Sequence, residues 1–147
     1  MTLNEKSLDL IKSFEQLRLK VYPDQAGLPT IGWGHLIKPD ENLTEITKEQ
    51  ADDLLKKDLQ IAEDAANKYI HVRLSDNQYG AIVSFIFNTG VQAFRGSTLL
   101  RKLNQGQFEE VPEHIAEWNK VTKNGVKQIS NGLVNRRMAE IKLWNTP

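Results

Sequence analysis

A long amphipathic helix in the first half of the chain limits the folds that the sequence can adopt. Thr47 and Gln50 form a capping box, in which each side chain accepts a hydrogen bond from the other's backbone N–H, and predict a helix from Lys48 to about Tyr69. Charged residues leave one face of this helix to solvent, and apolar residues form a stripe on the other: Ala51, Leu54, Leu55, Leu59, Ala62 and Ala66. We expect such a helix to connect two lobes.

The residues before this helix predict a short helix followed by a β-hairpin. A helix capped by Thr2 or Asn4 is expected to stop soon after Phe14, where the helical spacing of apolar residues breaks off. The turn-forming residues 23–27 (Pro-Asp-Gln-Ala-Gly) lie between β-branched and aromatic residues, which is typical of a hairpin. Glycines within residues 32–34 allow the returning strand to bend tightly.

The rest of the chain predicts helices only. Ser75 and Gln78 form a second capping box before a strongly apolar helix, which residues 88–90 (Asn-Thr-Gly) end. Three more helices and a turn are indicated by these signals: Ser97 as a cap, Pro112 in a first turn, a turn at residues 123–125, and Asn131 as a cap.

The predicted fold is therefore α+β and mostly helical, a single domain with two lobes. The small lobe spans about residues 1–50 and contains the hairpin. The connecting helix spans about residues 48–69, and the helical lobe about residues 70–147. A cleft between two lobes is a common place for a substrate site.

The composition narrows the chemistry available to such a site. The chain has no cysteine, and its three histidines, His35, His71 and His114, are scattered. Disulfides, thiol nucleophiles and thiolate zinc sites are therefore excluded, and we expect neither a metal nor another cofactor. Carboxylates and hydroxyls are the groups left for catalysis.

The ends and the charge of the chain bear on its location and partners. Neither a leader peptide nor a membrane-spanning apolar run is visible, so we expect synthesis in the cytoplasm and no stable membrane insertion. Residues 1–60 carry 8 Lys or Arg against 11 Asp or Glu, whereas residues 95–147 carry 9 against 5. The basic C-terminal third would attract a polyanion such as the bacterial wall or nucleic acid, although ordinary surface scatter explains so small an excess equally well.

Three residues near the hairpin could carry out glycoside hydrolysis, which needs an acid for the leaving oxygen and a second group across the bond. Glu15 lies at the C-terminal end of the first helix, where the helix dipole disfavours the ionised carboxylate. Asp24 lies in a polar turn that should keep it ionised, and Thr30 begins the returning strand, where its hydroxyl can face that turn. Position alone also fits an exposed helix-end Glu, a turn-forming Asp and a strand-forming Thr.

Residues 14–35 resemble the signature of the phage lysozymes of glycoside hydrolase family 24. A Glu, eight residues, an Asp, five residues and a Thr match the spacing of that family's catalytic triad. Residues 81–90 and 132–144 resemble two further blocks of the same family, in the same order along the chain. The resemblance implies a lysozyme-like fold and an endolysin that hydrolyses the β-1,4 bond from N-acetylmuramic acid to N-acetylglucosamine in peptidoglycan.

The same resemblance assigns roles to individual residues. It implies that Glu15 protonates the leaving oxygen, while Asp24 and Thr30 hold the attacking water on the opposite face, as in an inverting glycosidase. Sugar contacts are expected from three residues of the helical lobe: Phe87, Asn88 and Ser97.

Three further residues, His35 and the adjacent Arg136 and Arg137, are expected to support the site. His35 is expected to be buried and paired, and Trp33 to pack the small lobe rather than stack on a sugar. The resemblance implies that either Arg136 or Arg137 reaches the acid, but two adjacent arginines in one helix cannot be told apart from the sequence.

Peptidoglycan is the expected partner, and no nucleic acid is expected. The chain should act as a monomer on the wall, in the periplasm, after release through a pore made by a separate holin. Two other functions stay open. A lytic transglycosylase cleaves the same bond with one Glu and no attacking water. The other function is binding without catalysis, either by a wall-binding module or by a helical DNA-binding protein that uses the basic C-terminal third.

Overall fold

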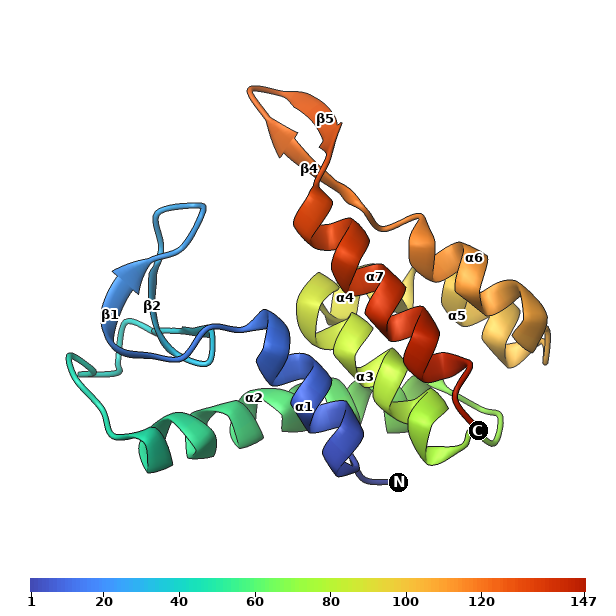
Figure 1. Cartoon of the computed structure of the whole chain (residues 1–147), viewed down its shortest axis with the longest axis horizontal. Coiled ribbons are helices and arrows are strands. Elements are labelled where there is room, and N and C mark those ends of the chain that lie inside the picture. Colours follow the sequence, from blue (N-terminus) through green and yellow to red (C-terminus); the bar gives the residue numbers. More distant parts are fainter.

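The computed structural model describes residues 1–147 and is mainly helical, with two small antiparallel sheets (Figure 1). The helices are α1 (Glu5–Phe14), α2 (Lys48–Tyr69), α3 (Asp76–Thr89), α4 (Val91–Arg95), α5 (Thr98–Asn104), the 3-10 helix η1 (Phe108–Glu110), α6 (Val111–Ala116) and α7 (Asn131–Trp144). The strands are β1 (Arg18–Pro23), β2 (Pro29–Gly32), β3 (His35–Leu36), β4 (Lys120–Lys123) and β5 (Val126–Ile129). The predicted α+β, mostly helical class is confirmed. None of the helices is both long and apolar enough to cross a membrane.

The small lobe is built on a three-stranded sheet in the order β1-β2-β3. β1 and β2 pair antiparallel, with Tyr22 opposite Thr30. Ile31 of β2 is fully buried and packs with Ile46 and Ala51 in a core of three buried residues. Because β2 is buried and β1 lies mostly exposed outside it, the sheet fixes the β1–β2 turn at the edge of the lobe.

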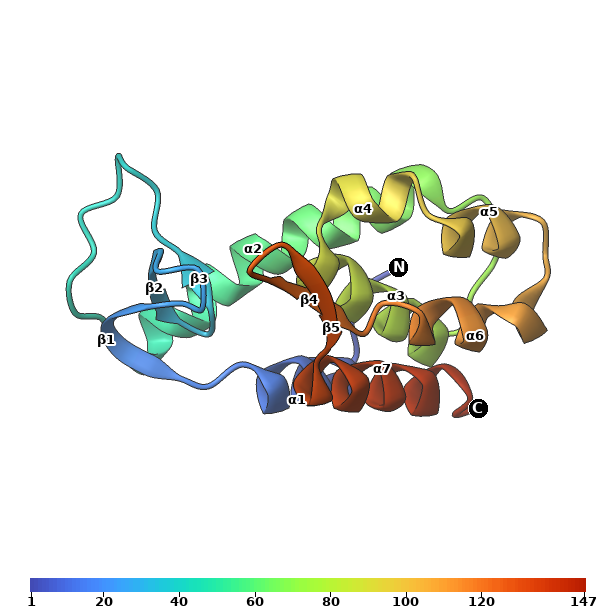
Figure 2. The same ribbon diagram turned by 90° about the horizontal axis from the view of Figure 1, so that it is seen from above.

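Helix α2 joins the two lobes, as its pattern predicts (Figure 2). The capping box of Thr47 and Gln50 is present, with both reciprocal hydrogen bonds. Ala51 packs in the core of the small lobe, whereas Leu55 and Leu59 belong to the larger core. One apolar stripe therefore contributes to both cores and sets the spacing of the two lobes.

The helical lobe is organised around α3, where nine of 14 residues are buried. α3 packs against α1, α2 and α7. The predicted small lobe of residues 1–50 included α1, but α1 packs on the helical lobe, with Ile11 fully buried in the larger core. Gly80 explains the close approach of α1 to α3, because a Cβ atom at Gly80 would lie 1.7 Å from Ser7 Oγ.

A second hairpin, β4–β5, corrects the prediction that this half of the chain is only helical. β4 and β5 pair in continuous register from Lys120 opposite Ile129 to Lys123 opposite Val126. The intervening Asn124-Gly125 turn has φ angles of 52° and 77°, as required by the tightest hairpin turn, for which Asn-Gly is the strongest sequence signal. The sequence therefore predicts the turn at residues 123–125 correctly but not the two strands that it joins.

Candidate active site

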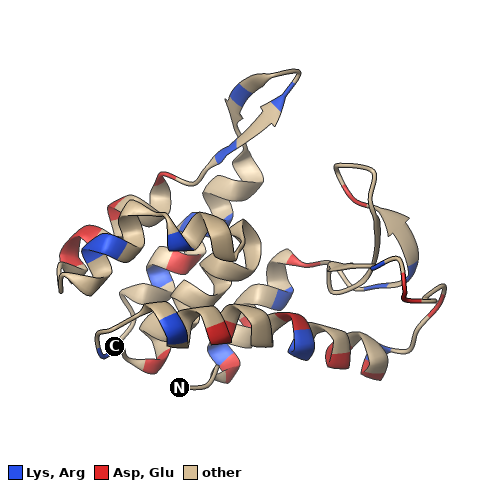
Figure 3. Ribbon diagram, turned by 180° about the vertical axis from the view of Figure 1, so that it is seen from behind, with Lys and Arg blue, Asp and Glu red and all other residues tan.

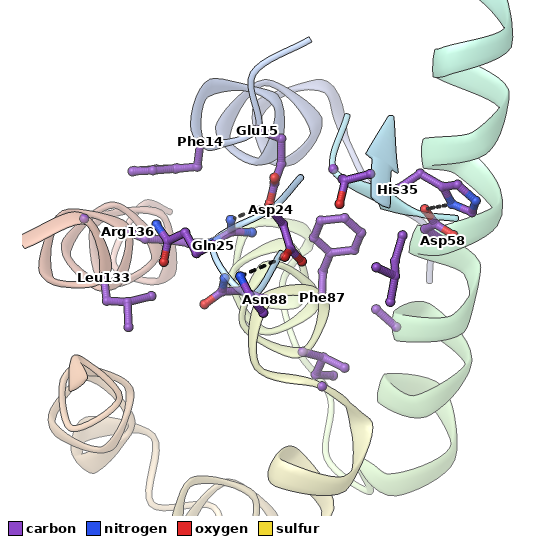
Figure 4. Close-up of a pocket in the computed structure, with 18 of the residues that line it drawn as sticks. Phe14, Glu15, Asp24, Gln25, His35, Asp58, Phe87, Asn88, Leu133 and Arg136 are labelled. Carbon is purple, nitrogen blue, oxygen red and sulfur yellow. Dashed lines mark hydrogen bonds and ion pairs between the residues drawn. The ribbon is translucent and has the colours of Figure 1, made fainter. Parts of the chain in front are cut away.

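A cleft of about 850 Å³ lies between the lobes, with residues of both hairpins on its walls. The β1–β2 turn borders it on one side, and the start of α7 and Val121 of β4 border it on the other. Figure 4 shows side chains of both lobes pointing into this space. The side chains that line the cleft include Glu15, Tyr22, Asp24, Thr30, Phe87, Asn88 and Arg136.

Glu15 reaches the cleft because α1 ends directly before it. Its extended backbone terminates the helix, while its N–H still donates to Ile11 O. The side chain is 22% exposed, and its Oε1 accepts a 3.0 Å hydrogen bond from Arg136 Nη1. Oε2 lies beside the Gly34 backbone, where a Cβ atom would be only 2.6 Å away. With a φ of 79° as well, position 34 favours glycine for two independent reasons.

Asp24 is held by the turn that it helps to form. Its Oδ1 accepts hydrogen bonds from the N–H groups of Ala26 (2.8 Å) and Leu28 (2.9 Å), and its own N–H donates to Leu28 O (2.9 Å). Asp side chains often order turns by such local bonds. Oδ2 is not engaged by these bonds, so the carboxylate keeps one oxygen for another partner.

Thr30 lies on β2 directly across the hairpin from this turn. Its side chain is buried, and its Oγ1 donates a 3.0 Å hydrogen bond to Leu28 O. The Leu28 N–H thus donates to Asp24, and the Leu28 carbonyl accepts from Thr30. Both side chains are therefore fixed to the same residue. Because the hydroxyl hydrogen is used, Thr30 presents only acceptor lone pairs to the cleft.

The helical lobe brings two of the three predicted sugar contacts to the cleft. Phe87 and Asn88 line it from the C-terminal turn of α3. Ser97 does not line it: the buried hydroxyl caps α5, accepting from Leu100 N–H (3.1 Å) and donating to Phe94 O (2.7 Å). The cap occupies Ser97 on both its donor and acceptor sides, which leaves it inside the lobe.

His35 is buried and paired on both ring nitrogens. Nδ1 lies 2.8 Å from Asp58 of α2, and Nε2 lies 2.9 Å from Glu41. Burial alone would lower the pKa of His35, but the hydrogen bonds to Asp58 and Glu41 outweigh it and raise that pKa. The pair with Asp58 fastens β3 to α2 beside the cleft (Figure 4). Trp33 packs the small lobe and donates to Asp52 Oδ1 at 2.7 Å.

The two adjacent arginines have different partners. Arg136 contacts the acid and lies between the rings of Phe14 (5.6 Å) and Phe87 (6.0 Å). Arg137 is outside the cleft, and its Nη2 donates to Asn88 Oδ1. Successive helical residues point about 100° apart, so neighbouring elements decide which arginine meets Glu15.

Tyr22 and Glu140 have no role predicted from the sequence. Tyr22 lines the cleft, and burial and then the Glu15 carboxylate raise the pKa of its phenol, against the opposing charge of Arg18. Glu140 is completely buried behind the arginines. Tyr22 could have been found from its place in the hairpin block, whereas a single Glu in a helix carries no signal of burial.

Known proteins resemble this chain in both sequence and fold. The family model described as phage lysozyme matches residues 12–140. The endolysin of Acyrthosiphon pisum secondary endosymbiont phage 1 is 42% identical over 149 residues, covering 99% of both chains. The solved endolysin from Escherichia coli O157:H7 phage FAHEc1 has a TM-score of 0.92 at 40% identity, over 99% of this chain and 94% of that chain. The muramidase domain of SpmX from Asticaccaulis excentricus has a TM-score of 0.90 at 36% identity, over 99% of both chains. The chain therefore belongs to the phage lysozyme family and is a lysozyme-type glycosidase.

Proposed function

We propose that this lysozyme acts as an endolysin and hydrolyses the β-1,4 bond between N-acetylmuramic acid and N-acetylglucosamine of peptidoglycan, with inversion. Glu15 is the general acid, and Asp24 and Thr30 hold the attacking water. One observation carries the proposal: a helix end and a hairpin bring these three side chains to one cleft. Within it, Leu28 fixes both Asp24 and Thr30.

The oxygen of Glu15 that transfers the proton follows from its contacts. Oε1 accepts a hydrogen bond from Arg136, so Oε2 is the oxygen left to carry a proton. Proton transfer from Oε2 to the glycosidic oxygen lets the bond to the anomeric carbon break, and both bonding electrons leave with that oxygen. The backbone at Gly34 leaves room for this oxygen, which a Cβ atom would take up.

The water is held by two acceptors. Oδ2 of Asp24 and a lone pair of Thr30 Oγ1 can each accept one of its hydrogens, which leaves a water lone pair for the anomeric carbon. As the new C–O bond forms, one proton passes to Asp24. The hydroxyl therefore adds to the sugar on the face opposite the leaving group, and the configuration inverts.

One substitution and a matched control test the role of Glu15 as the general acid. Glu15→Gln keeps the size of the side chain but removes the acid, and we expect lysis of purified peptidoglycan to fall by about 10²–10⁴-fold. Glu113→Gln makes the same change at an exposed position outside the cleft and should leave the rate unchanged. A Glu15→Gln variant with a near wild-type rate would refute the assignment.

The products separate hydrolysis from the transglycosylase alternative. An enzyme that positions a water leaves a free reducing end on muramic acid, whereas a transglycosylase leaves a 1,6-anhydro end. We expect mass spectrometry of digested peptidoglycan to show reducing ends only. A majority of 1,6-anhydro ends would mean that Asp24 and Thr30 do not deliver water.

We also propose that the enzyme works as a monomer and reaches the wall through a separate holin pore. The cleft supports the first part, because one chain supplies both of its walls. Light scattering of the purified protein should give one chain per particle, near 16.8 kDa. Host lysis should depend on holin co-expression, and lysis at full rate without a holin would contradict the second part.

A further inference from the structure

Glu140 of α7 is a carboxylate with no exposure to solvent at all. Ser84 Oγ of α3 donates a 2.6 Å hydrogen bond to its Oε2. Arg136 Nε lies 3.4 Å from the same oxygen, and Arg137 Nε lies 3.0 Å from Oε1. Glu140 is therefore shared by Arg136, which lines the cleft, and by Arg137, which lies outside it.

These contacts join two residues of the cleft through the interior. Arg136 lies between Glu15 (3.0 Å) and Glu140 (3.4 Å), and Arg137 lies between Glu140 and Asn88. A series of contacts therefore connects Glu15 to Asn88 through Arg136, Glu140 and Arg137.

Packing alone does not explain a Glu at this position. Burial raises the pKa of Glu140, and the two arginines and Ser84 act against that effect. Burial also lowers the pKa of Arg137, and the charge of Glu140 acts against that effect. Well-packed apolar residues are often at least as stabilising as buried ion pairs, so a gain in stability is a weak reason for this cluster.

Resting on the proposed function, we propose that Glu140 is a positioning residue that aims Arg136 at Glu15 and Arg137 at Asn88. By sharing the charge of Arg136, Glu140 weakens the hold of that guanidinium on Glu15. Glu140 also keeps Asn88 in place through Arg137.

Among the groups around Arg136 and Arg137, Glu140 is the carboxylate that lies inside the helical lobe. From α3, the polar group that faces Glu140 is the Ser84 hydroxyl. From α1, the charged group is Glu15 itself, and the Phe14 ring lies beside Arg136. On the side of the hairpin, Tyr22 and Asp24 are the titratable groups near Glu15.

The test is Glu140→Gln, which removes the charge and keeps the size. We expect kcat to fall by about tenfold to a hundredfold, with a smaller rise in KM because Arg137 then holds Asn88 less firmly. The alkaline limb of the pH–rate profile should move to lower pH, because Arg136 is then no longer shared with a second carboxylate. An unchanged limb with unchanged kcat would overturn the proposal, as would a shift to higher pH.

Three further variants separate positioning from folding. Glu140→Asp keeps the charge, so its alkaline limb should stay at the wild-type pH even if kcat falls. Glu63→Gln neutralises a half-buried carboxylate of α2 outside the cleft and should move melting temperature but not the limb. If Glu140→Gln does not fold, Ser84→Ala should move the limb in the same direction by a smaller amount, and no movement would overturn the proposal.

Failure of the proposed function has a different signature. It would appear as an active Glu15→Gln enzyme or as anhydro products, whatever the pH profile of the Glu140 variants. Failure of the positioning role would leave the products and the Glu15→Gln loss intact while the limb stayed in place.

Discussion

Two hairpins border the same cleft, but they are held by opposite means. In β1–β2, the inner strand is buried and the turn is ordered by Asp24. In β4–β5, no strand residue is buried, and Val126 and Ile129 are 58% and 64% exposed. The first hairpin is thus part of a folded lobe, whereas the second depends on its own strand pairing and on its attachment to α6 and α7.

The charges of the hairpins differ as well. Figure 3 shows the β4–β5 hairpin with basic residues and no acidic one, and an acidic residue in the β1–β2 turn. Lys120, Lys123 and Lys127 supply the basic charge of β4–β5, whereas β1–β2 carries Asp24 in its turn and Arg18 and Lys20 on its outer strand. We infer that the first hairpin supplies chemistry and tolerates little change, while the second supplies attraction to an anionic wall and tolerates much.

The largest expected effect lies in the turn of the first hairpin. Asp24→Asn keeps an Oδ1 that accepts from Ala26 and Leu28, so the turn should survive while the base is lost. We expect peptidoglycan hydrolysis to fall by about 10²–10⁴-fold. Lys123→Gln, at the turn of the other hairpin, also changes one charge and should alter the rate less than about twofold. Equal losses in both variants would show that the first hairpin is no more important to catalysis than the second.

Stability should differ between the two hairpins as clearly as activity. Ile31→Ala creates a cavity in the small core and should lower the free energy of unfolding by about 2–5 kcal/mol. Val126→Ala shortens an exposed side chain and should change it by less than about 0.5 kcal/mol. Urea unfolding curves of both variants give the two values. A large loss in Val126→Ala would show that β4–β5 is integral to the fold.

The pH dependence of stability should reveal the anchor of the first sheet. Because the folded-state pKa of His35 is raised, its bonds to Asp58 and Glu41 stabilise the protein fully below the unfolded pKa of about 6.5. That contribution is lost as pH rises through the folded pKa. His35→Gln should therefore cost more stability at pH 5 than at pH 8.5, measured as the gap from wild type in urea unfolding. A gap that widens toward alkaline pH would contradict the assignment.

The smallest effect is expected from the lysines of the second hairpin. Replacing Lys120, Lys123 and Lys127 by Gln should slow wall lysis by roughly two- to fivefold at low ionic strength. The difference should vanish near 1 M salt, where charges are screened beyond about 3 Å. The matched triple Lys→Arg variant keeps the charge and should behave as wild type. A loss that persists at high salt would mean that these side chains act by contact.

The parts of the fold that follow from local rules could be predicted from the sequence. Both capping boxes, the end of α1 after Phe14 and the β1–β2 hairpin depend on neighbouring residues, and all are present. The β4–β5 hairpin also has a local signal, Asn124-Gly125. These residues predict the turn, but helices are expected on both sides of it, so the two strands are not predicted.

The site depends more on tertiary packing, and its prediction was correspondingly less complete. Ser97 matches a family position at the cleft and also predicts a helix cap; the cap is present, and it keeps the hydroxyl away from the cleft. The choice between Arg136 and Arg137, and the burial of Glu140, depend on how α7 packs against α1 and α3. No spacing along one helix contains that information.

The configuration of the first product tests the central claim, that the β1–β2 hairpin delivers water to the face opposite Glu15. Proton NMR of a peptidoglycan oligosaccharide, recorded as cleavage begins, distinguishes the two anomers of the new reducing end before they equilibrate. We predict that the α-anomer of N-acetylmuramic acid accumulates first. Initial release of the β-anomer would contradict a water held by Asp24 and Thr30.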